Sequence, residues 1–277
     1  MFGEFQSRLT ASGWLVCETA IRIGGGREVD ITAPDLPVVR DAAGKPYIPG
    51  SSIKGVLRSY VESVLRAMGG EKAACDALNF DRCCIRPGKR RSNDGVYLSD
   101  LIDRCDRDER RLAAEIEKAS CLVCAVFGSQ AMASHVTFSD MPVENWFGQY
   151  QVRNGVSIDR DSGRAAEGKL YDFEVVPAGT RFRFRAVLEN GDDWKRGVLS
   201  LALSALENAS VSIGGASSRG LGILRLEALE LRLIGSPDDL LSALDGTAPR
   251  EGTEVSEENR STWVQALRTR LKELAHA

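Results

Sequence analysis

One short stretch of the chain combines an acidic loop, a rigid turn and a basic helix start: DLPVVRDAAGKPYIPGSSIKGVLR, residues 35–58. Its first carboxylate, Asp35, lies in a loop rich in glycine and proline, where a side chain can be exposed. An exposed carboxylate can deprotonate a 2′-hydroxyl or hold a divalent ion near a phosphate, and RNA strand scission needs one or the other. Asp30 and Asp41 are nearby competitors, and a turn-capping or solvated aspartate is the alternative.

The second half of this stretch predicts a helix over residues 52–68, because apolar residues recur there at spacings of three and four. Pro49 and Gly50 precede it, Ser51 is the expected N-cap, and Gly69-Gly70 is the expected end. Lys54 and Arg58 share one side of its first turns, beside the free N–H groups of a helix start, which is an arrangement that binds phosphate. Ser52 and Ser51 add hydroxyl donors. A capped helix with merely solvated cations is the alternative.

A second candidate anion site is the loop SIGGASSRGLGIL, residues 212–224. Its glycines allow the main chain to approach a phosphate and to offer N–H donors in a concave turn. The loop matches neither a P-loop nor the Rossmann spacing, and ordinary tight turns are the alternative. We expect it to form one binding face with the helix start. Its candidate residues are Gly214, Gly215, Ser217, Ser218, Arg219 and Gly220.

Six of the seven cysteines fall within one third of the chain. Cys121 and Cys124 form a CxxC, and a second pair upstream would complete a tetrahedral zinc site. Spacing alone leaves that pair open among Cys75, Cys83, Cys84 and Cys105. We expect a structural zinc ion that staples a polar segment. A redox CxxC is the alternative, but no thioredoxin-like pattern surrounds it.

Composition limits the classes of function. The two histidines, His135 and His276, argue against a two-histidine ribonuclease or a Ser-His hydrolase. A net charge of −3 argues weakly against nucleic acid, but the basic residues are clustered. The clusters are Arg86, Lys89, Arg90 and Arg91, and Arg181, Arg183 and Arg185 on one strand face. No apolar run could span a bilayer and the start lacks a signal-peptide pattern, so we expect a cytoplasmic protein.

The order of predicted elements favours an α+β, ferredoxin-like core with insertions. Strands are predicted at residues 9–23, 136–138, 172–176 and 180–188, and helices near 109–118 and over 193–206. A phase slip between Ala228 and Leu229 in the last core strand predicts a β-bulge. The linker DGTAPREGTEVS is disorder-like. Apolar residues from Trp263 to Leu274 predict a final amphipathic helix, docked on this chain or on a neighbour.

The stretch around Asp35, the glycine-rich loop and the segment from Arg153 to Phe184 together resemble the RAMP superfamily, in the Csm-type backbone subunits of type III CRISPR effector complexes. The resemblance implies an RRM-like core over residues 1–235, with a β-hairpin thumb at about 153–172. It also implies a zinc-binding insertion at 70–125 held by Cys75, Cys84, Cys121 and Cys124. Residues 236–277 would be a linker and terminal helix.

The resemblance also implies a function. Asp35 matches the aspartate with which such subunits cleave target RNA, using Mg²⁺ or another divalent cation. The glycine-rich loop and the helix start would grip guide RNA, and Arg153 and Arg160 would flank the start of a thumb that reaches over the guide–target duplex. The expected partners are guide RNA, complementary target RNA, other subunits and further copies of this chain. The alternatives are a non-cleaving backbone subunit, a guide-processing ribonuclease and a zinc-stabilised protein adaptor.

Overall fold

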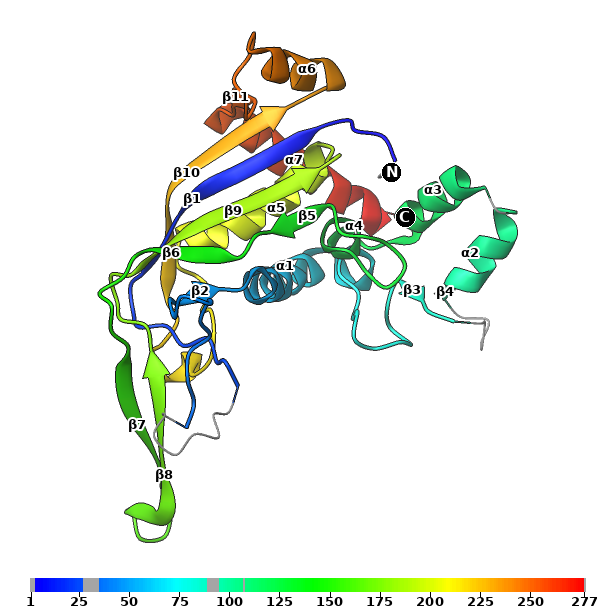
Figure 1. Ribbon diagram of the computed structural model, residues 1–277. Helices are drawn as coiled ribbons and strands as arrows, with labels where there is room; N and C mark the ends of the chain where they lie inside the picture. The colour runs from blue at the N-terminus through cyan, green and yellow to red at the C-terminus, as the bar shows by residue number, and fades with distance from the viewer. Residues whose placement is uncertain (1–2, 27–34, 89–94, 107, 277) are drawn as a thin grey trace.

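The computed structural model describes residues 3–26, 35–88, 95–106 and 108–276. Its centre is an antiparallel sheet with the strand order β11-β10-β1-β9-β6-β2, in which β5 also pairs with β9 (Figure 1). The strands are β1 (Arg8–Cys17), β2 (Tyr47–Ile48), β5 (Val136–Phe138), β6 (Met141–Asn145), β9 (Arg181–Glu189), β10 (Leu224–Ile234) and β11 (Thr253–Glu254). With the seven helices among the described residues, this sheet confirms the expected mixed α and β class.

Helices cover one face of the sheet (Figure 1). They are α1 (Gly50–Ala73) and α5 (Asp193–Glu207), with α7 (Glu257–His276) packed on α5. Helix α1 directs one apolar stripe inward, because the residues at positions 53, 57, 61 and 65 are fully buried. Each such side chain contributes roughly 1.5–3 kcal/mol through burial. The predicted end at Gly69-Gly70 appears as a kink, since Gly70 has a φ of 62° and helical turns resume until Ala73.

The opposite face of the sheet exposes the basic stripe predicted on β9. Arg183 pairs with Glu144 at 2.9 Å, and the guanidinium carbon of Arg183 lies 5.7 Å from the centre of the Trp14 ring. Arg185 pairs with Glu251 at 3.6 Å. These acidic partners offset part of the positive charge of the stripe.

The β-bulge predicted in the last core strand is confirmed. In the pairing of β1 with β10, Ser12 lies opposite Glu230, whereas Trp14, two residues on, lies opposite Glu227. Ala228 takes up the extra residue with a φ of 49°. The first strand is shorter than predicted: it ends at Cys17, because the chain then bends.

The C-terminal segment belongs to the same packed unit. The predicted disorder of the linker is wrong, because β11 within it pairs with β10, and helix α6 (Pro237–Asp245) precedes it. In α7, Trp263, Leu267 and Leu271 are buried in the main core. A Cβ at Gly197 of α5 would lie 2.3 Å from the carbonyl oxygen of Trp263, so only glycine allows this approach. The terminal helix therefore docks on this chain.

A small lobe projects from one end of the molecule (Figure 1). It contains β3 (Ile85–Arg86), β4 (Val96–Tyr97), α2 (Leu98–Arg104) and α3 (Glu109–Ala119). Buried Ile85, Leu101 and Ile116 give it an apolar cluster of its own. The next helix, α4 (Leu122–Phe127), is entirely buried and joins the lobe to the main core.

A long hairpin projects from the other end, formed by β7 (Gln151–Ile158) and β8 (Ala165–Val175) (Figure 1). It is longer than the predicted thumb at 153–172. Gly155 lies under the ring of Tyr171, where a Cβ would come within 2.3 Å of a ring carbon. None of the helices within the described residues is long and apolar enough to cross a membrane.

Candidate functional site

Asp35 is exposed at the base of the hairpin. Its segment runs along β8, where Leu36 forms a parallel bridge with Phe173. The main-chain N–H of Asp35 donates to Oδ1 of Asp172 at 2.8 Å, and the N–H of Asp172 donates to Oδ2 of Asp35 at 3.2 Å. The first bond fixes the backbone of Asp35 and the second fixes its carboxylate, while the residue stays exposed to solvent.

The segment is fixed further along by Glu174, which is buried in β8. Its Oε2 accepts the N–H of Val38 at 3.1 Å and pairs with Arg40. The competitor Asp41 is engaged locally, because its Oδ1 accepts the N–H groups of Ala43 and Lys45, both at 2.9 Å. Asp30 lies outside the described residues.

The glycine-rich loop docks on residues 20–22. The N–H of Gly215 donates to the carbonyl oxygen of Arg22 at 2.8 Å, and the N–H of Gly222 donates to that of Ala20 at 2.9 Å. Gly214 has a φ of 91°, and a Cβ there would lie 2.2 Å from the Arg22 oxygen. These two N–H groups are therefore used inside the protein, and the tip of the loop is the part exposed to solvent. The tip consists of Ser217, Ser218, Arg219 and Gly220, with the short 3₁₀ helix η1 at Ser217–Arg219.

A pocket of about 290 Å³ joins the loop, the Asp35 segment and the hairpin. Arg22 lines this pocket, with its guanidinium carbon 5.9 Å from the centre of the Phe173 ring. Within the described part of the chain, the buried Nε of Arg22 has no hydrogen-bond partner. Arg219 closes one side by donating to the hydroxyl of Tyr171. The lining residues are Arg22, Leu36, Tyr171, Phe173, Ala216 and Arg219.

The start of α1 differs from its prediction. The helix begins at Gly50 after Pro49, and Ser51 makes no capping bond; instead Oδ1 of Asp140 accepts the N–H of Gly50 at 2.8 Å. Glycine is required at position 50, since a Cβ would lie 2.2 Å from the carbonyl oxygen of Phe138. One carboxylate thus already occupies the helix start. The first turn of α1 therefore offers a phosphate fewer donors than predicted, and only the remaining ones stay as candidates.

Those donors are Ser51, which is exposed, and Ser52 and Lys54, which are half-buried. Burial, and then the positive charge of Arg58, lower the pKa of Lys54.

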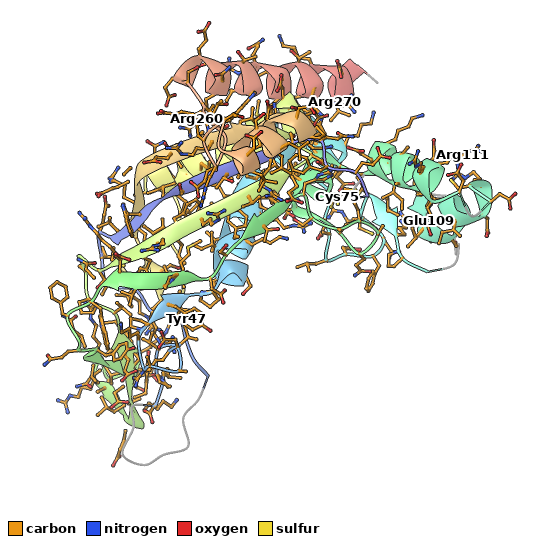
Figure 2. All side chains as sticks on the ribbon, turned by 45° about the horizontal axis from the view of Figure 1, so that its top comes forward. Tyr47, Cys75, Glu109, Arg111, Arg260 and Arg270 are labelled. Atoms are coloured by element: carbon orange, nitrogen blue, oxygen red, sulfur yellow. The ribbon has the colours of Figure 1, made fainter. Side chains whose placement is uncertain are left out.

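The candidate RNA-binding elements lie at one end of the molecule. In Figure 1, β2, the start of α1 and η1 lie toward the end of the molecule that carries the hairpin. Figure 2 places Tyr47 of β2 at that end and Cys75 at the junction with the lobe.

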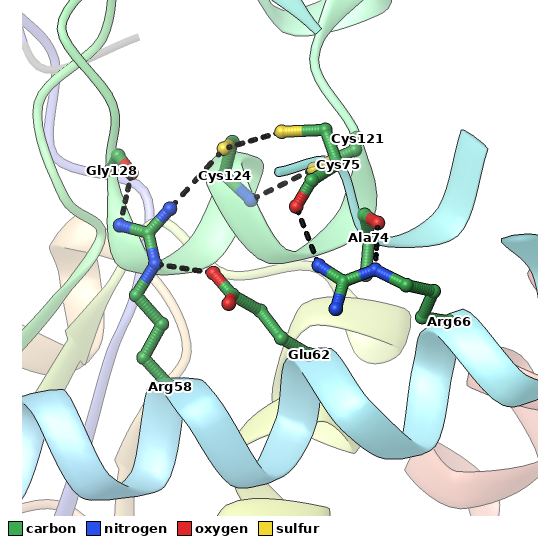
Figure 3. A network of polar contacts seen from close by, with 8 residues as sticks. All are labelled: Arg58, Glu62, Arg66, Ala74, Cys75, Cys121, Cys124 and Gly128. Atoms are coloured by element: carbon green, nitrogen blue, oxygen red, sulfur yellow. Dashed lines mark hydrogen bonds and ion pairs between the residues drawn. The ribbon is translucent and has the colours of Figure 1, made fainter. Parts of the chain in front are cut away.

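The remaining predicted cations lie in two different environments. Arg153 in β7 and Arg160 in the hairpin turn are exposed and available to a ligand. Arg58 is half-buried, and its guanidinium is bonded within the protein to Glu62, Gly128 and Cys124 (Figure 3). Of the basic cluster predicted upstream, Arg86 donates to the carbonyl oxygen of Asp81. Lys89, Arg90 and Arg91 lie outside the described residues.

The structure brings together the four cysteines that the resemblance implied. The sulfur atoms of Cys75, Cys84, Cys121 and Cys124 all lie within 4.8 Å of one another. The sulfurs of Cys75 and Cys124 are 3.6 Å apart. Four ligands at a Zn–S distance of about 2.3 Å would lie about 3.8 Å apart, so the group fits a tetrahedral metal ion.

The other candidate cysteines do not join this group. Cys105 is buried elsewhere, and Cys83 donates to the carbonyl oxygens of Phe80 and Ile85. Hydrogen bonding between Cys121 and Cys124 lowers the pKa of Cys121 and raises that of Cys124. Three of the four cysteines are buried and Cys84 is half-buried, and such a group of four thiols can hold a metal ion.

The family described as the RAMP superfamily matches residues 14–225, well over half of the sequence. The chain belongs to the RAMP superfamily. The family resemblance of its motifs is thereby confirmed. The match covers the end of β1, the Asp35 segment, the cysteine group, the hairpin and the glycine-rich loop of this RAMP protein.

Three relatives carry the name "CRISPR system Cms endoribonuclease Csm3". The relative from Enterococcus italicus is 43% identical over 221 residues, which cover 79% of this chain and 89% of the relative. The relative from Methanothermobacter thermautotrophicus is 25% identical over 258 residues, 83% of this chain and 87% of its own length. The relative from Methanocaldococcus jannaschii is 24% identical over 266 residues, 92% and 91% of the two chains.

Sequence reasoning missed three residues of this RAMP protein's site: Arg22, Tyr171 and Asp172. One signal was present, because Tyr171 and Phe173 alternate with acidic residues in a strand that leaves a polar hairpin. No sequence pattern pointed to Arg22, because a single cation after a strand is usually solvated. These residues come together because three segments that are far apart in the chain fold against one another.

Proposed function

We propose that this protein is a backbone subunit of a type III CRISPR ribonucleoprotein, which binds guide RNA and cleaves complementary target RNA as an endoribonuclease. Asp35 is the catalytic residue. The observation that carries the proposal is the exposed Asp35 carboxylate, held against Asp172 beside a pocket lined by Arg22 and Arg219. The names of the three relatives, and the share of each chain that they cover, support the same activity.

The chemistry requires a 2′-oxygen to lose its proton and to attack the adjacent phosphorus, from which the 5′-oxygen of the next nucleotide leaves. The Asp35 carboxylate promotes this step by taking the proton, or by orienting a divalent cation that neutralises the developing charge. Among the hydrogen bonds of the described residues, only Oδ2 of the Asp35 carboxylate is used, so Oδ1 is left for a cation. A hard carboxylate oxygen suits Mg²⁺, which binds proteins through one or two carboxylates together with substrate phosphates. Asp172 keeps the carboxylate at the base of the hairpin.

RNA binding is assigned to the exposed donors at the hairpin end of the molecule. The loop tip would contact the guide backbone together with the start of α1, and the hairpin arginines would reach the duplex. Arg22 and Tyr171 extend this set, because a cation and an aromatic face together bind unstacked nucleotides. The assigned residues are Arg22, Ser51, Ser52, Lys54, Arg153, Arg160, Tyr171, Gly214, Ser217, Ser218, Arg219 and Gly220, and Gly215 is left out because its N–H already donates to Arg22.

The proposal includes a ferredoxin-like core. The chain order β1-α1-β5-β9-α5-β10 and the sheet order β10-β1-β9-β5 support it. The four cysteines hold a structural Zn²⁺ that fixes an insertion at 70–125 to this core. Residues 1–235 form the core with its hairpin thumb, and residues 236–277 form a brace over α5. The complex, which contains other subunits and further copies of this chain, works in the cytoplasm.

The test is to purify the assembled complex through a tag on this chain and to sequence the RNA that accompanies it. We expect repeat-derived guides, and cleavage of RNA complementary to them but not of a scrambled RNA. If guides are recovered but target RNA is not cleaved, the protein is a non-cleaving backbone subunit. Cleavage of precursor repeat RNA by this chain would make it a guide-processing enzyme, and absence of bound RNA would contradict the proposal.

A further inference from the structure

All three guanidinium nitrogens of Arg58 donate hydrogen bonds, and one of them reaches the cysteine group (Figure 3). Nη2 donates to the sulfur of Cys124 at 3.4 Å, and Nη1 donates to the carbonyl oxygen of Gly128, which ends α4, at 3.0 Å. Nε donates to Oε1 of Glu62 at 2.7 Å, one turn further along α1. The side chain therefore bridges α1, the end of α4 and one sulfur of the cysteine group.

A second arginine holds the same group from the next part of α1. Nε of Arg66 donates to the carbonyl oxygen of Ala74 at 3.0 Å, and Nη2 donates to that of Cys75 at 2.8 Å (Figure 3). These bonds fix the backbone that presents the Cys75 sulfur. Arg66 acts on main-chain atoms, whereas Arg58 contacts sulfur itself.

The bond from Arg58 to Cys124 matters because of the negative charge that the metal-bound cysteine group would carry. Four thiolates around a divalent ion carry a net charge of −2, and the sulfurs of Cys75, Cys121 and Cys124 come from residues that are at most 3% exposed. Burying such charge is costly unless donors and cations compensate it. A guanidinium stays protonated and its N–H groups point in fixed directions, so it can compensate the charge of one sulfur while bonding two other acceptors.

We propose that Arg58 is the charge-compensating partner of the metal centre and couples metal occupancy to the position of α1. The inference rests on the proposed metal site. From α1, Arg58 donates to the Cys124 sulfur and to the Gly128 carbonyl oxygen, so a metal ion that fixes the cysteine group would also fix α1 against the end of α4. Because Ser51, Ser52 and Lys54 occupy the first turn of the same helix, the metal centre supports the RNA-facing end from a distance. Arg58 is a positioning residue, and its earlier assignment to RNA binding is replaced by this role.

The first measurement is the affinity of the full chain for Zn²⁺, by competition with a chromophoric chelator, together with the thiolate-to-metal charge-transfer spectrum after Co²⁺ loading. Arg58→Gln should weaken Zn²⁺ binding about 10–100-fold, as loss of a partner bonded to a ligand typically does. It should also shift the Co²⁺ spectrum, because one sulfur loses its donor. Arg58→Lys, which keeps the charge but not the three-way geometry, should fall between wild type and Arg58→Gln.

The matched control is Arg82→Gln. Arg82 lines the cavity that opens onto Cys75 and Cys84, but it pairs with Glu71. Its loss removes a nearby positive charge without removing a bond to sulfur, so the Zn²⁺ affinity should change less than about threefold. An equal loss in Arg82→Gln and Arg58→Gln would overturn the specific role of Arg58.

Coupling to α1 is tested by hydrogen exchange at residues 50–58. Metal removal should speed exchange there in wild type. It should have little further effect in Arg58→Lys, because the link between α1 and the cysteine group is already weakened in that variant. Wild-type Zn²⁺ affinity and an unchanged Co²⁺ spectrum in Arg58→Gln would overturn the inference; if that variant does not fold, the same results in Arg58→Lys would do so. A wild-type chain that binds neither Zn²⁺ nor Co²⁺ would instead refute the metal site itself.

Discussion

Asp35 and Asp172 hold each other through two hydrogen bonds, each made by the backbone N–H of one residue and the carboxylate of the other. The two residues are 137 positions apart in the chain. The pair ties the loop that carries Asp35 to the base of the β7–β8 hairpin. A movement of the hairpin on a bound duplex would therefore move the carboxylate with it.

Asp172 is predicted to position Asp35 and not to take part in the reaction itself. Asp172→Ala removes the acceptor for the Asp35 N–H, and target cleavage should fall by about 10–100-fold because the backbone that carries Asp35 loses one of its two anchors. Asp172→Asn keeps an acceptor oxygen, and cleavage should stay within about threefold of wild type with the same Mg²⁺ dependence. Single-turnover assays on assembled complexes measure both. Equal losses in the two variants would show that the Asp172 charge itself is needed.

The glycine-rich loop is predicted to depend on Gly214 for its docking. Gly214→Ala should reduce the free energy of unfolding by about 2–4 kcal/mol, because a positive φ and a clash with the Arg22 oxygen combine. Gly220→Ala is the matched control: φ is 81° there but nothing lies within 4 Å of the added Cβ, so about 1–2 kcal/mol is expected. Denaturant unfolding distinguishes the two. Equal losses would contradict the docking geometry.

Much of the fold and part of the cysteine group could be predicted from local patterns. The apolar stripe of α1 and the phase slip at Ala228 are periodic signals, and they predicted the helix and the bulge. The CxxC marked half of the cysteine group, but spacing could not choose the other half. Cys75 and Cys84 joined it only through the resemblance and then through their three-dimensional proximity.

Long-range contacts account for what the sequence did not reveal. Ser51 has the side chain of a good N-cap, yet the carboxylate of Asp140, 90 residues from Gly50, satisfies the helix start. Arg58 has the spacing of a phosphate ligand, yet it bonds to Cys124. Both predictions used neighbours along the chain, whereas the observed partners come from other elements that fold against α1.

Arg219 is predicted to contact an RNA phosphate. Arg219→Gln should weaken RNA binding for all sequences alike and should reduce the slope of log affinity against log salt by about 0.7, the value for one phosphate of a single strand. Arg270→Gln, on α7 and paired with Glu273, is the control and should leave the slope unchanged. Salt titrations of binding provide the test. An unchanged slope in Arg219→Gln would remove this residue from the RNA contacts.

His135 is predicted to make the fold sensitive to acid. Burial, and to a lesser extent the charge of Lys195, lower the pKa of His135 in the folded state, although its Nδ1 lies 2.7 Å from the carbonyl oxygen of Glu189. The unfolded chain therefore binds the proton first as the pH falls. The stabilisation is complete above about pH 6.5 and is lost below it, by up to about 1.4 kcal/mol per pH unit until the folded-state pKa is reached.

His135→Gln should flatten this dependence, since glutamine does not titrate. Denaturant unfolding at pH 7.5 and pH 5.5 measures the difference for each protein. If the wild type and His135→Gln lose the same free energy between those pH values, the acid sensitivity comes from other groups.

The most direct test of the account is single-turnover cleavage of a complementary target RNA by complexes that differ only at Asp35. Asp35→Ala should reduce the cleavage rate by at least about 100-fold while guide and target binding stay at wild-type levels. Asp41→Ala, which removes a nearby carboxylate engaged in a turn, should cleave normally. Wild-type cleavage by the Asp35→Ala complex would contradict the central claim that this carboxylate cuts RNA.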